Sequence, residues 1–440
     1  MPARHERLPL TAAQTWVWLA QQAQPQNPAH KAAEYLDVRG PVDVALVEAA
    51  VRRAVAEAEA FRIRIGADER GPWQVVDPAA AWPLPVVDLR DAADPWQQAQ
   101  AWMAADLEQP LDPASELPFR MTLLRLAADR CLLHVACHHI AMDGYGFSLF
   151  AQRIAEHYTA WESEWDRGAN PFGSLRALVA DEIGYLGSDR FQRDREYWLR
   201  ELAELPEIRS LSGAPHRAAP CRNFLRETET VPVAVVDRLR EQARRSRVSL
   251  PTLAMAALGV HTHLVTGSED LLLELTVTGR QGAIARTTPG MLSNTLPLRL
   301  RVRPEMSVAE LLRHTAERAR GLLQHQRYPL LYLPQDLGIP DMSEIPQPPA
   351  INIMGYDPPL RFGQHPVTLH NLSNGSVEDF ALNVYQRCAE GSLRIDSNAS
   401  PALYRPEDVI AHHRGFLDVF HALADVDPEQ PVGKLAPQIV

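Results

Sequence analysis

The stretch Leu132–Phe150, LLHVACHHIAMDGYGFSLF, changes its pattern of apolar residues in the middle. Residues 132–137 form the short, largely apolar run that is typical of a strand, whereas residues 147–158 repeat their apolar side chains at the spacing of one helix face. Residues 138–144, HHIAMDG, lie between them and contain two histidines, a carboxylate and a glycine. The sequence therefore predicts a strand-to-helix turn that places an imidazole within reach of a substrate.

A histidine at the end of a strand is more often structural than functional, so the residues around this pair decide its interpretation. The chain offers an internal comparison in His412-His413, which lies in a predicted amphipathic helix with no Asp-Gly after it. We interpret that second pair as structural. The first pair differs because Asp143 follows His139 by four residues, Gly144 comes next, and the group lies between two predicted elements.

Length and charge limit the classes of function. The chain has 440 residues, which is long for a single core and predicts two domains. Its formal net charge is −11 and it contains no basic run, which argues against nucleic-acid binding because that needs clustered cations. No apolar run approaches the ~20 residues of a membrane-spanning helix, and the N-terminal sequence MPARHERLPL lacks the apolar region of a signal peptide. We therefore expect a soluble globular protein that does not lie in a membrane.

The four cysteines are scattered and form no Cys-x-x-Cys pair or zinc pattern. Cysteines used in this way are typical of a reducing compartment, so we expect a cytoplasmic protein with no bound metal. They are Cys131, Cys137, Cys221 and Cys388.

The segment HHIAMDG matches HHxxxDG, the signature of the condensation domains of nonribosomal peptide synthetases, which belong to the chloramphenicol acetyltransferase-like acyltransferases. Other blocks that resemble this family follow in the family's order and extend the resemblance over essentially the whole chain. They are Ala13-Gln14 in a predicted helix capped by Thr11, TPGMLSNTLPL at 288–298, and a His-Gln-x-Tyr-Pro block at 325–329. One block departs from the pattern, because the family's arginine-rich segment usually begins Arg-His-Glu and residues 57–60 read Glu-Ala-Glu-Ala.

The resemblance implies an α/β (α+β) fold of two chloramphenicol acetyltransferase-like lobes. Each lobe would be a mixed sheet flanked by helices, and the two would form a V shape around a central tunnel. The stretch 166–173 contains Gly, Asn and Pro without apolar periodicity and is the best boundary candidate. We therefore expect an N-terminal lobe at 1–172, which carries HHxxxDG, and a C-terminal lobe at 173–440 that opens with a long helical region at 176–205.

Amide formation from a thioester needs a neutral amine, correct placement and stabilisation of an oxyanion. His139 is the candidate that accepts the amine proton or positions the amine, since a histidine titrates near neutral pH, and the sequence leaves both roles open. His138 is expected to support the turn, and the Gly144 N–H at the helix start is a candidate oxyanion donor. No Gly-x-Ser-x-Gly motif is present, which favours direct transfer without an acyl-enzyme.

The resemblance also places an arginine, here Arg280, beneath the active site and beside the motif aspartate. A buried Asp143 needs such a partner because an unpaired buried charge is costly. We therefore predict an Asp143–Arg280 ion pair that holds the turn, with Asp143 not acting as a general acid. The resemblance further implies that Ser293 and Asn294 lie beside the tunnel and that Asn352 faces it.

The resemblance implies that the domain itself binds no cofactor. The chain has no Gly-rich phosphate loop and no Asp-Ser-Leu type attachment site, so both substrates are expected on the phosphopantetheine arms of partner proteins. The expected partners are a donor and an acceptor carrier protein, peptidyl or aryl, and an adjacent adenylation domain, with the domain itself monomeric. The resemblance thus points to bacterial secondary metabolism, in siderophore or lipopeptide biosynthesis.

The Tyr-Leu-x-Ser spacing at 185–188 and the block at 288–298 resemble condensation domains that begin an assembly line with an acyl or aryl donor lacking an α-amine. Three alternatives stay open: an epimerisation domain, a small-molecule acyltransferase that uses acyl-CoA and the pattern from His139 to Asp143, and a carrier-binding domain without activity. A glutamate motif for the first is not evident, and the Asp-Phe-Gly-Trp-Gly block of one class of the second is missing. Cyclisation domains are disfavoured because they replace the two histidines with an aspartate.

Overall fold

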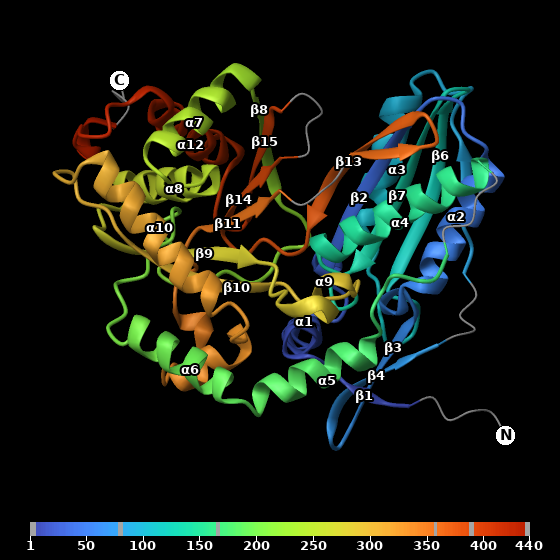
Figure 1. Ribbon diagram of the computed structural model, residues 1–440, viewed down its shortest axis with the longest axis horizontal. Coiled ribbons are helices and arrows are strands. Elements are labelled where there is room, and N and C mark those ends of the chain that lie inside the picture. Colours follow the sequence, from blue (N-terminus) through green and yellow to red (C-terminus); the bar gives the residue numbers. More distant parts are fainter. Residues whose placement is uncertain (1–5, 78–81, 164–167, 356–358, 387–390, 436–440) are drawn as a thin grey trace. The chain divides into compact units, whose positions relative to one another are not determined.

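A computed structural model describes residues 6–77, 82–163, 168–355, 359–386 and 391–435 of the chain (Figure 1). Within these residues the chain forms two six-stranded mixed sheets and one three-stranded antiparallel sheet, with helices flanking them. The predicted fold class, α/β with two helix-flanked mixed sheets, is confirmed.

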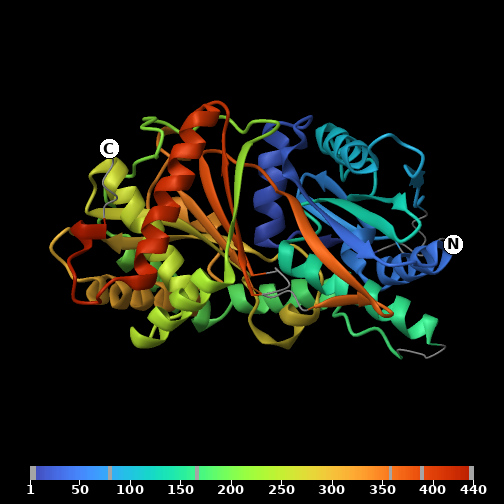
Figure 2. The same ribbon diagram turned by 90° about the horizontal axis from the view of Figure 1, so that it is seen from above.

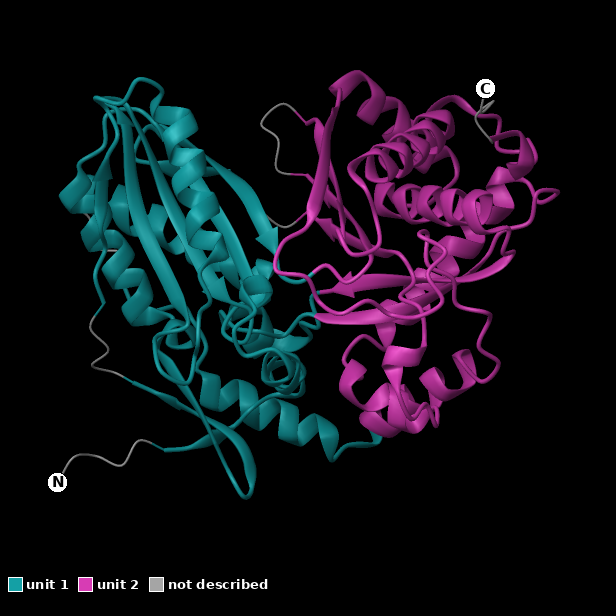
Figure 3. Ribbon diagram, turned by 180° about the vertical axis from the view of Figure 1, so that it is seen from behind, with its two compact units in different colours: residues 1–189, 278–293, 356–376 teal, residues 190–277, 294–355, 377–440 magenta. Residues whose placement is uncertain are grey.

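By its internal contacts the chain divides into two compact units, each assembled from three stretches of sequence (Figure 3). Unit 1 comprises residues 1–189, 278–293 and 356–376, and unit 2 comprises residues 190–277, 294–355 and 377–440. The later two stretches of unit 1 lie far along the chain, and one of them supplies strands to its main sheet. The lobe boundary after residue 172 assumes two continuous segments and stays a prediction. Residues 166 and 167 of that boundary stretch lie outside the described residues.

The main sheet of unit 1 has six strands in the described residues. They are β2 (Lys31–Arg39), β5 (Val86–Asp88), β6 (Phe119–Ala127), β7 (Arg130–His138), β12 (Leu360–Phe362) and β13 (His365–Asn374). Their order is β12-β13-β2-β7-β6-β5, antiparallel except for the β5–β6 pair.

The small sheet joins β1 (Leu8–Pro9), β4 (Gly71–Val76) and β3 (Ile63–Asp68). The helices are α1 (Ala12–Ala23), α2 (Val44–Glu57), α3 (Pro95–Glu108), α4 (Gly144–Glu162), α5 (Leu175–Leu186) and α9 (Gly282–Thr287), with 3-10 turns η1 (Pro28–His30) and η2 (Glu59–Arg62).

Both faces of the main sheet of unit 1 are covered by helices. Successive residues of a strand point to opposite faces, so Leu132 and Leu133 of β7 enter different clusters. Leu133 packs with Leu36 of β2 and Phe150 of α4, whereas Leu132 packs with Met103 of α3. The strand that leads to HHIAMDG is therefore buried on both faces, which gives the following turn a rigid base.

The sheet of unit 2 has six strands in the described residues. They are β8 (Leu225–Val231), β9 (Asp270–Val277), β10 (Asn294–Arg301), β11 (Ala350–Met354), β14 (Phe380–Tyr385) and β15 (Leu393–Ala399), in the order β10-β9-β11-β14-β15-β8. The helices are α6 (Asp189–Glu201), α7 (Val233–Arg245), α8 (Leu250–Thr266), α10 (Val308–Gln324), α11 (Leu333–Asp336) and α12 (Pro406–Asp425), with 3-10 turns η3 (Leu330–Tyr332), η4 (Met342–Glu344) and η5 (Val432–Leu435). Among the described residues no single helix has the length and hydrophobicity to cross a membrane, although the bent pair α7 and α8, at 96°, meets both criteria when taken together.

The two faces of the unit 2 sheet differ in polarity. On one face Leu275, Ile351 and Leu382 lie side by side in β9, β11 and β14 and belong to the cluster that α8, α10 and α12 cover. One residue further along each strand, the other face carries Thr276, Asn352 and Asn383 in register. The predicted tunnel residue Asn352 thus lies on a polar face, away from the helix-covered core.

Two further predictions can be compared with the structure. Thr11 caps α1, as predicted, and the structure adds a capping box between Thr11 and Gln14. The long helical region at 176–205 is two helices, since α5 ends at Leu186 and α6 begins at Asp189, with Gly187 at the break.

The second histidine pair lies in α12, as predicted, and both of its members make side-chain contacts with neighbouring elements. His413 Nδ1 lies 2.8 Å from Ser397 Oγ, and His412 Nδ1 lies 3.2 Å from His261 Nε2 of α8. These contacts join α12 to its neighbours, which agrees with a structural interpretation of this pair.

Three buried histidines make the stability of the fold sensitive to acid. Burial lowers the pKa of His30 to about 4 and that of His138 and His261 to about 3, from an ordinary 6.5. At these three positions the unfolded chain therefore binds more protons than the folded protein below pH 6.5. The acid Glu274, whose pKa burial raises to about 7, acts in the opposite direction, but with one proton against three. We expect the free energy of unfolding, measured by urea titration, to fall as the pH drops from 6.5 towards 4, by up to about 1.4 kcal/mol per histidine and pH unit. A constant free energy of unfolding between pH 7 and 5 would contradict this.

Candidate active site

The predicted strand-to-helix turn is present. β7 ends at His138, α4 begins at Gly144, and Asp143 is the N-cap of that helix. Asp143 Oδ1 accepts a hydrogen bond from the Gly146 N–H at 2.8 Å, which satisfies a donor that the first helical turn leaves free. Gly144 is the first helical residue, so its N–H has no acceptor inside the helix.

The predicted ion pair between Asp143 and Arg280 is confirmed. Arg280 Nη1 donates to Asp143 Oδ2 at 2.6 Å, and the side chains are only 2% and 1% exposed. The same carboxylate oxygen accepts from the backbone N–H groups of Leu292 and Ser293, both at 2.9 Å. Both oxygens of Asp143 are therefore occupied by donors, so the carboxylate is engaged in structure and not placed to exchange a proton with a substrate.

Arg280 extends this anchor to the segment 288–293. Its Nη2 donates to the carbonyl oxygens of Gly290 at 3.2 Å and Thr288 at 3.4 Å, and the Asp143 N–H also donates to Gly290 O at 3.2 Å. The guanidinium carbon lies 4.7 Å from the centre of the Tyr145 ring, a cation–π distance. The turn, the arginine and the segment 288–293 thus form one hydrogen-bonded junction inside unit 1.

Close backbone contacts at this junction require glycine, which the sequence analysis did not single out. A Cβ on Gly146 would lie 2.5 Å from Met142 Sδ and 2.9 Å from the backbone N of Gly290. A Cβ on Gly279 would lie 2.2 Å from the carbonyl oxygen of Leu292, and the φ of Gly279 is +65°. The sequence did hold one indication for Gly146. A glycine in the first turn of a predicted helix lowers helix stability relative to alanine, which suggests another reason for its presence.

His138 uses both ring nitrogens within the protein. Its Nδ1 accepts from the Ile140 N–H at 3.1 Å, so the proton is on Nε2, which lies 3.0 Å from Gln21 Oε1 of α1. Burial lowers the pKa of His138 to about 3, and repulsion from His30 and His139 in their protonated forms adds to this effect. The ring is therefore neutral and bridges the turn to α1.

His139 is placed differently, with a half-buried side chain at the start of the turn. Its backbone N–H donates to His30 O at 2.8 Å, and its Nδ1 is buried with no hydrogen-bond partner among the described residues. Burial lowers the pKa of His139, and the nearby charge of Asp143 opposes that shift only in part. The imidazole is therefore neutral near pH 7, which is the state that accepts a proton.

A second support for the turn comes from two glutamines. Gln14 Nε2 of α1 donates to the carbonyl oxygen of Ile140 at 3.1 Å, which fixes the middle of the turn. Gln14 and Gln74 of β4 also bond reciprocally, amide to amide, at 3.0 and 2.8 Å, and both are buried. The Ala13-Gln14 block thus has a physical role in holding the histidine turn, whereas Gln74 had no signal in the sequence.

Not all predicted site residues meet at this junction. His138, His139, Asp143, Gly144, Arg280 and Ser293 belong to unit 1, while Asn294 and Asn352 belong to unit 2. Ser293 contributes its backbone N–H to Asp143. The Asn294 amide instead donates to the carbonyl oxygens of Gln326 at 3.1 Å and Tyr328 at 2.7 Å, so it holds the His-Gln-x-Tyr-Pro segment.

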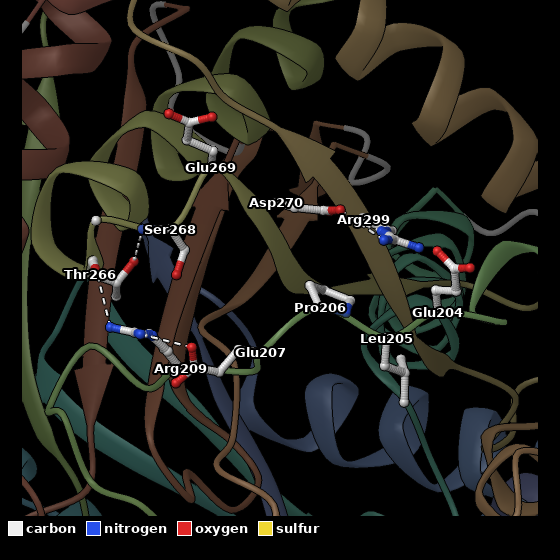
Figure 4. Close-up of a pocket in the computed structure, with 11 residues that line it drawn as sticks. Glu204, Leu205, Pro206, Glu207, Arg209, Thr266, Ser268, Glu269, Asp270 and Arg299 are labelled. Carbon is white, nitrogen blue, oxygen red and sulfur yellow. Dashed lines mark hydrogen bonds and ion pairs between the residues drawn. The ribbon is translucent and has the colours of Figure 1, made fainter.

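A pocket of about 480 Å³ on unit 2 lies between the segment after α6 and the turn between α8 and β9 (Figure 4). Its two arginines are already paired, Arg209 with Glu207 and Arg299 with Asp270. None of the eight predicted site residues lines it. In the part of the chain that the structure describes, no group of three or more histidine, cysteine or carboxylate side chains is gathered as metal ligands.

We expect Arg280→Ala to destabilise the protein strongly, because Asp143 would remain buried without a cation. Removing one partner of a buried pair typically costs ~3–5 kcal/mol, which urea titration would measure as a loss in the free energy of unfolding. Arg90→Ala is the control, because Arg90 and its partner Asp88 are 42% and 45% exposed and their pairing should matter far less. Equal losses in the two variants would show that the buried pair does not hold the turn.

The family model "Condensation domain" matches residues 4–437. The chain is 37% identical to a dimodular nonribosomal peptide synthase of Bacillus subtilis (strain 168) over 97% of this chain and 18% of the relative. It is 37% identical to an isonitrile lipopeptide synthase of Streptomyces coeruleorubidus (98% and 29%) and 30% identical to enterobactin synthase component F of Escherichia coli (strain K12) (92% and 32%). The chain thus spans less than a third of the length of each of these relatives.

Solved structures of single condensation domains match over nearly their whole length. The starter condensation domain of rhizomide synthetase RzmA, as a mutant in complex with C8-CoA, gives a TM-score of 0.90 at 36% identity, covering 97% of this chain and 96% of that one. The first condensation domain of the calcium-dependent antibiotic synthetase, in complex with a substrate analogue, gives 0.89 at 32% identity, covering 98% of each chain. The family match over residues 4–437, together with a histidine turn in the expected position, shows that the chain belongs to the condensation domains of nonribosomal peptide synthetases, which are acyltransferases that form amide bonds.

Proposed function

We propose that this domain begins an assembly line: it transfers an acyl group without an α-amine from one carrier-bound thioester to the amine of a carrier-bound aminoacyl group. The donor proposal rests on similarity to two kinds of relative. One is the starter domain of rhizomide synthetase, determined with C8-CoA, and the other is a 37% identical isonitrile lipopeptide synthase. Nonribosomal peptide synthetases hold their intermediates on phosphopantetheine arms. The partners proposed here are a donor carrier, an acceptor carrier and an adjacent adenylation domain.

The observation that carries the catalytic proposal is the contrast between Asp143 and His139. Asp143 accepts four hydrogen bonds from protein donors and its side chain is 1% exposed, so it is not accessible to a substrate. His139 is held by its backbone, is neutral near pH 7 and has a half-buried ring. We assign His139 the role of receiving the amine proton or fixing the amine in place, and Asp143 with Arg280 the role of holding the turn.

In the proposed reaction the acceptor amine attacks the thioester carbonyl carbon, forming the new C–N bond and an oxyanion. Collapse of this intermediate breaks the C–S bond and returns the thiol to the donor arm, and the amine proton passes by way of His139 to that sulfur. The Gly144 N–H, free at the start of α4, is the proposed donor to the oxyanion. General-base help is typically worth ~10²–10⁴-fold, and placement of two reactants up to ~7–11 kcal/mol.

Ser293 and Asn294 keep a structural role in this proposal, through the backbone bond to Asp143 and the amide bonds to the 326–328 carbonyls. Asn352 keeps the tunnel-facing role that the resemblance implied, supported by its place on the polar face of the unit 2 sheet.

The first test is a condensation assay followed by intact mass. One carrier bears a C8 acyl group or, in parallel, a dihydroxybenzoyl group, and the other bears one of a panel of aminoacyl groups. We expect acyl transfer to the acceptor, which His139→Ala lowers by ~10²–10⁴-fold because the proton acceptor is lost. His216→Ala is the control, since that histidine is exposed and belongs to unit 2.

Other outcomes of this assay would replace the proposal. Hydrogen exchange at the Cα of a loaded peptidyl thioester, without transfer, would indicate epimerisation. Transfer from acyl-CoA to a free amine, with no carrier needed, would indicate a small-molecule acyltransferase.

A second test follows the protonation of His139 by NMR in protein labelled at histidine, with the resonance assigned by its loss in His139→Ala. Because burial lowers the pKa of this imidazole, we expect it to stay neutral as the pH falls to 6.5 and to titrate only below that. The urea-unfolded protein is the reference, where the same group regains its ordinary value. Titration of the folded protein at or above pH 6.5 would contradict a buried, neutral base.

A further inference from the structure

The end of β13 reaches the histidine turn from a distant part of the chain. β13 pairs with one edge of β2 and β7 with the other, and all three strands meet at the first residues of β2 (Figure 1 and Figure 2). There Lys31 lies opposite His138, and Ala32 lies opposite Asn374. The residues that follow His138 and Asn374 therefore leave the sheet at the same end.

Ser373 controls how the chain leaves β13. Its hydroxyl donates to the carbonyl oxygen of Lys31 at 3.0 Å and accepts from the Gly375 N–H at 3.2 Å. The register of β13 on β2 shifts between Asn371 and Ser373, as at a β-bulge, and Ser373 is buried. The backbone at Gly375 is thus tied to β2 by a buried hydroxyl and is not a free loop.

Gly375 lies directly against the imidazole of His139. A Cβ at this position would be 2.8 Å from His139 Cδ2 and 3.5 Å from Nε2, and the next atom within reach is Ala29 O at an ordinary 3.9 Å. The φ of Gly375 is +96°, a conformation that residues with a Cβ rarely adopt. Two independent constraints, backbone conformation and lack of space, therefore require glycine.

The contact is specific to the ring of His139. The backbone of His139 is fixed through His30 O, so an added methyl group at 375 would be relieved mainly by rotation of the imidazole. Such a rotation moves the nitrogen that faces a substrate, and displacement of a reacting group by about 1 Å can cost ~10²-fold in rate. Gly375 has no side chain with which to bind a substrate itself.

We propose that Gly375 is a positioning residue for catalysis: its backbone, anchored by Ser373 to β2, sets the orientation of the His139 imidazole. This inference rests on the proposed role of His139 in condensation.

The test compares Gly375→Ala with Gly71→Ala in the carrier-loaded assay. Gly71 is the matched control because its φ is +109°, yet a Cβ there would meet no atom within 4 Å. Both variants carry similar backbone strain, and only the first touches His139. We expect Gly375→Ala to lower kcat by about 10²-fold with little change in KM for either carrier, and Gly71→Ala to keep the wild-type kcat.

A double variant and NMR separate positioning from general damage. If Gly375 acts through His139, Gly375→Ala should lower kcat no further in a His139→Ala background. The His139 resonance should also titrate closer to 6.5 in Gly375→Ala, because rotation out of the buried position reduces the desolvation that lowers its pKa. Asp143, His30 and His138 are the titratable groups that act on it, and the substitution changes none of them.

The outcomes are distinguishable. Wild-type protein that condenses no donor would overturn the proposed function, while the NMR comparison would still test the contact. Active wild type with equal kcat for Gly375→Ala and Gly71→Ala, or an unshifted His139 resonance, would overturn the inference. If Gly375→Ala does not fold, Ser373→Ala replaces it: loss of the anchor should lower kcat several-fold and shift the His139 resonance, and no change in either would overturn the inference.

Discussion

The buried ion pair between Asp143 and Arg280 is the interaction on which the candidate active site depends. Taking two charges out of water costs several kcal/mol for each ion, so such a pair persists only with good geometry and further hydrogen bonds. Both are present here, since backbone N–H groups of Gly146, Leu292 and Ser293 donate to the carboxylate and backbone carbonyls accept from the guanidinium. These hydrogen bonds offset the cost of burying the two charges. Because they come from the backbone, they also hold the chain in the conformation of the turn.

The two adjacent histidines of the turn have different environments. His138 points towards α1 and has both nitrogens engaged, so it behaves as part of the core. His139 follows it by one residue and has a half-buried ring whose Nδ1 has no hydrogen-bond partner among the described residues. The charge of Asp143 opposes the effect of burial on the pKa of His139, but burial is the larger influence and the pKa stays below its ordinary value. His139 is therefore neutral near pH 7, which its proposed role of receiving the amine proton requires.

The parts of this site that could be predicted from sequence are those with a local signal. The change from strand to helix periodicity located the turn, and the capping residue Thr11 marked the start of α1. The partner of Asp143, 137 residues away, came from the resemblance, since no periodicity connects distant positions. The same limit explains why Gly146 and Gly375 were missed. Their importance comes from atoms of Gly290 and His139 that approach them in space, and a glycine in isolation gives no indication of what it touches.

The order of the chain explains the discontinuous units. Residues 1–189 contain the two histidines and the aspartate, but the arginine comes from 278–293 and the strand beside β2 from 356–376. Without these later segments Asp143 would be a buried charge with no cation, and β2 would lose the hydrogen-bonding partner along one edge. Each defect is costly enough to disfavour a folded N-terminal stretch on its own. The two returning segments are therefore integral parts of unit 1, and its histidine turn is complete only when residues beyond 370 are in place.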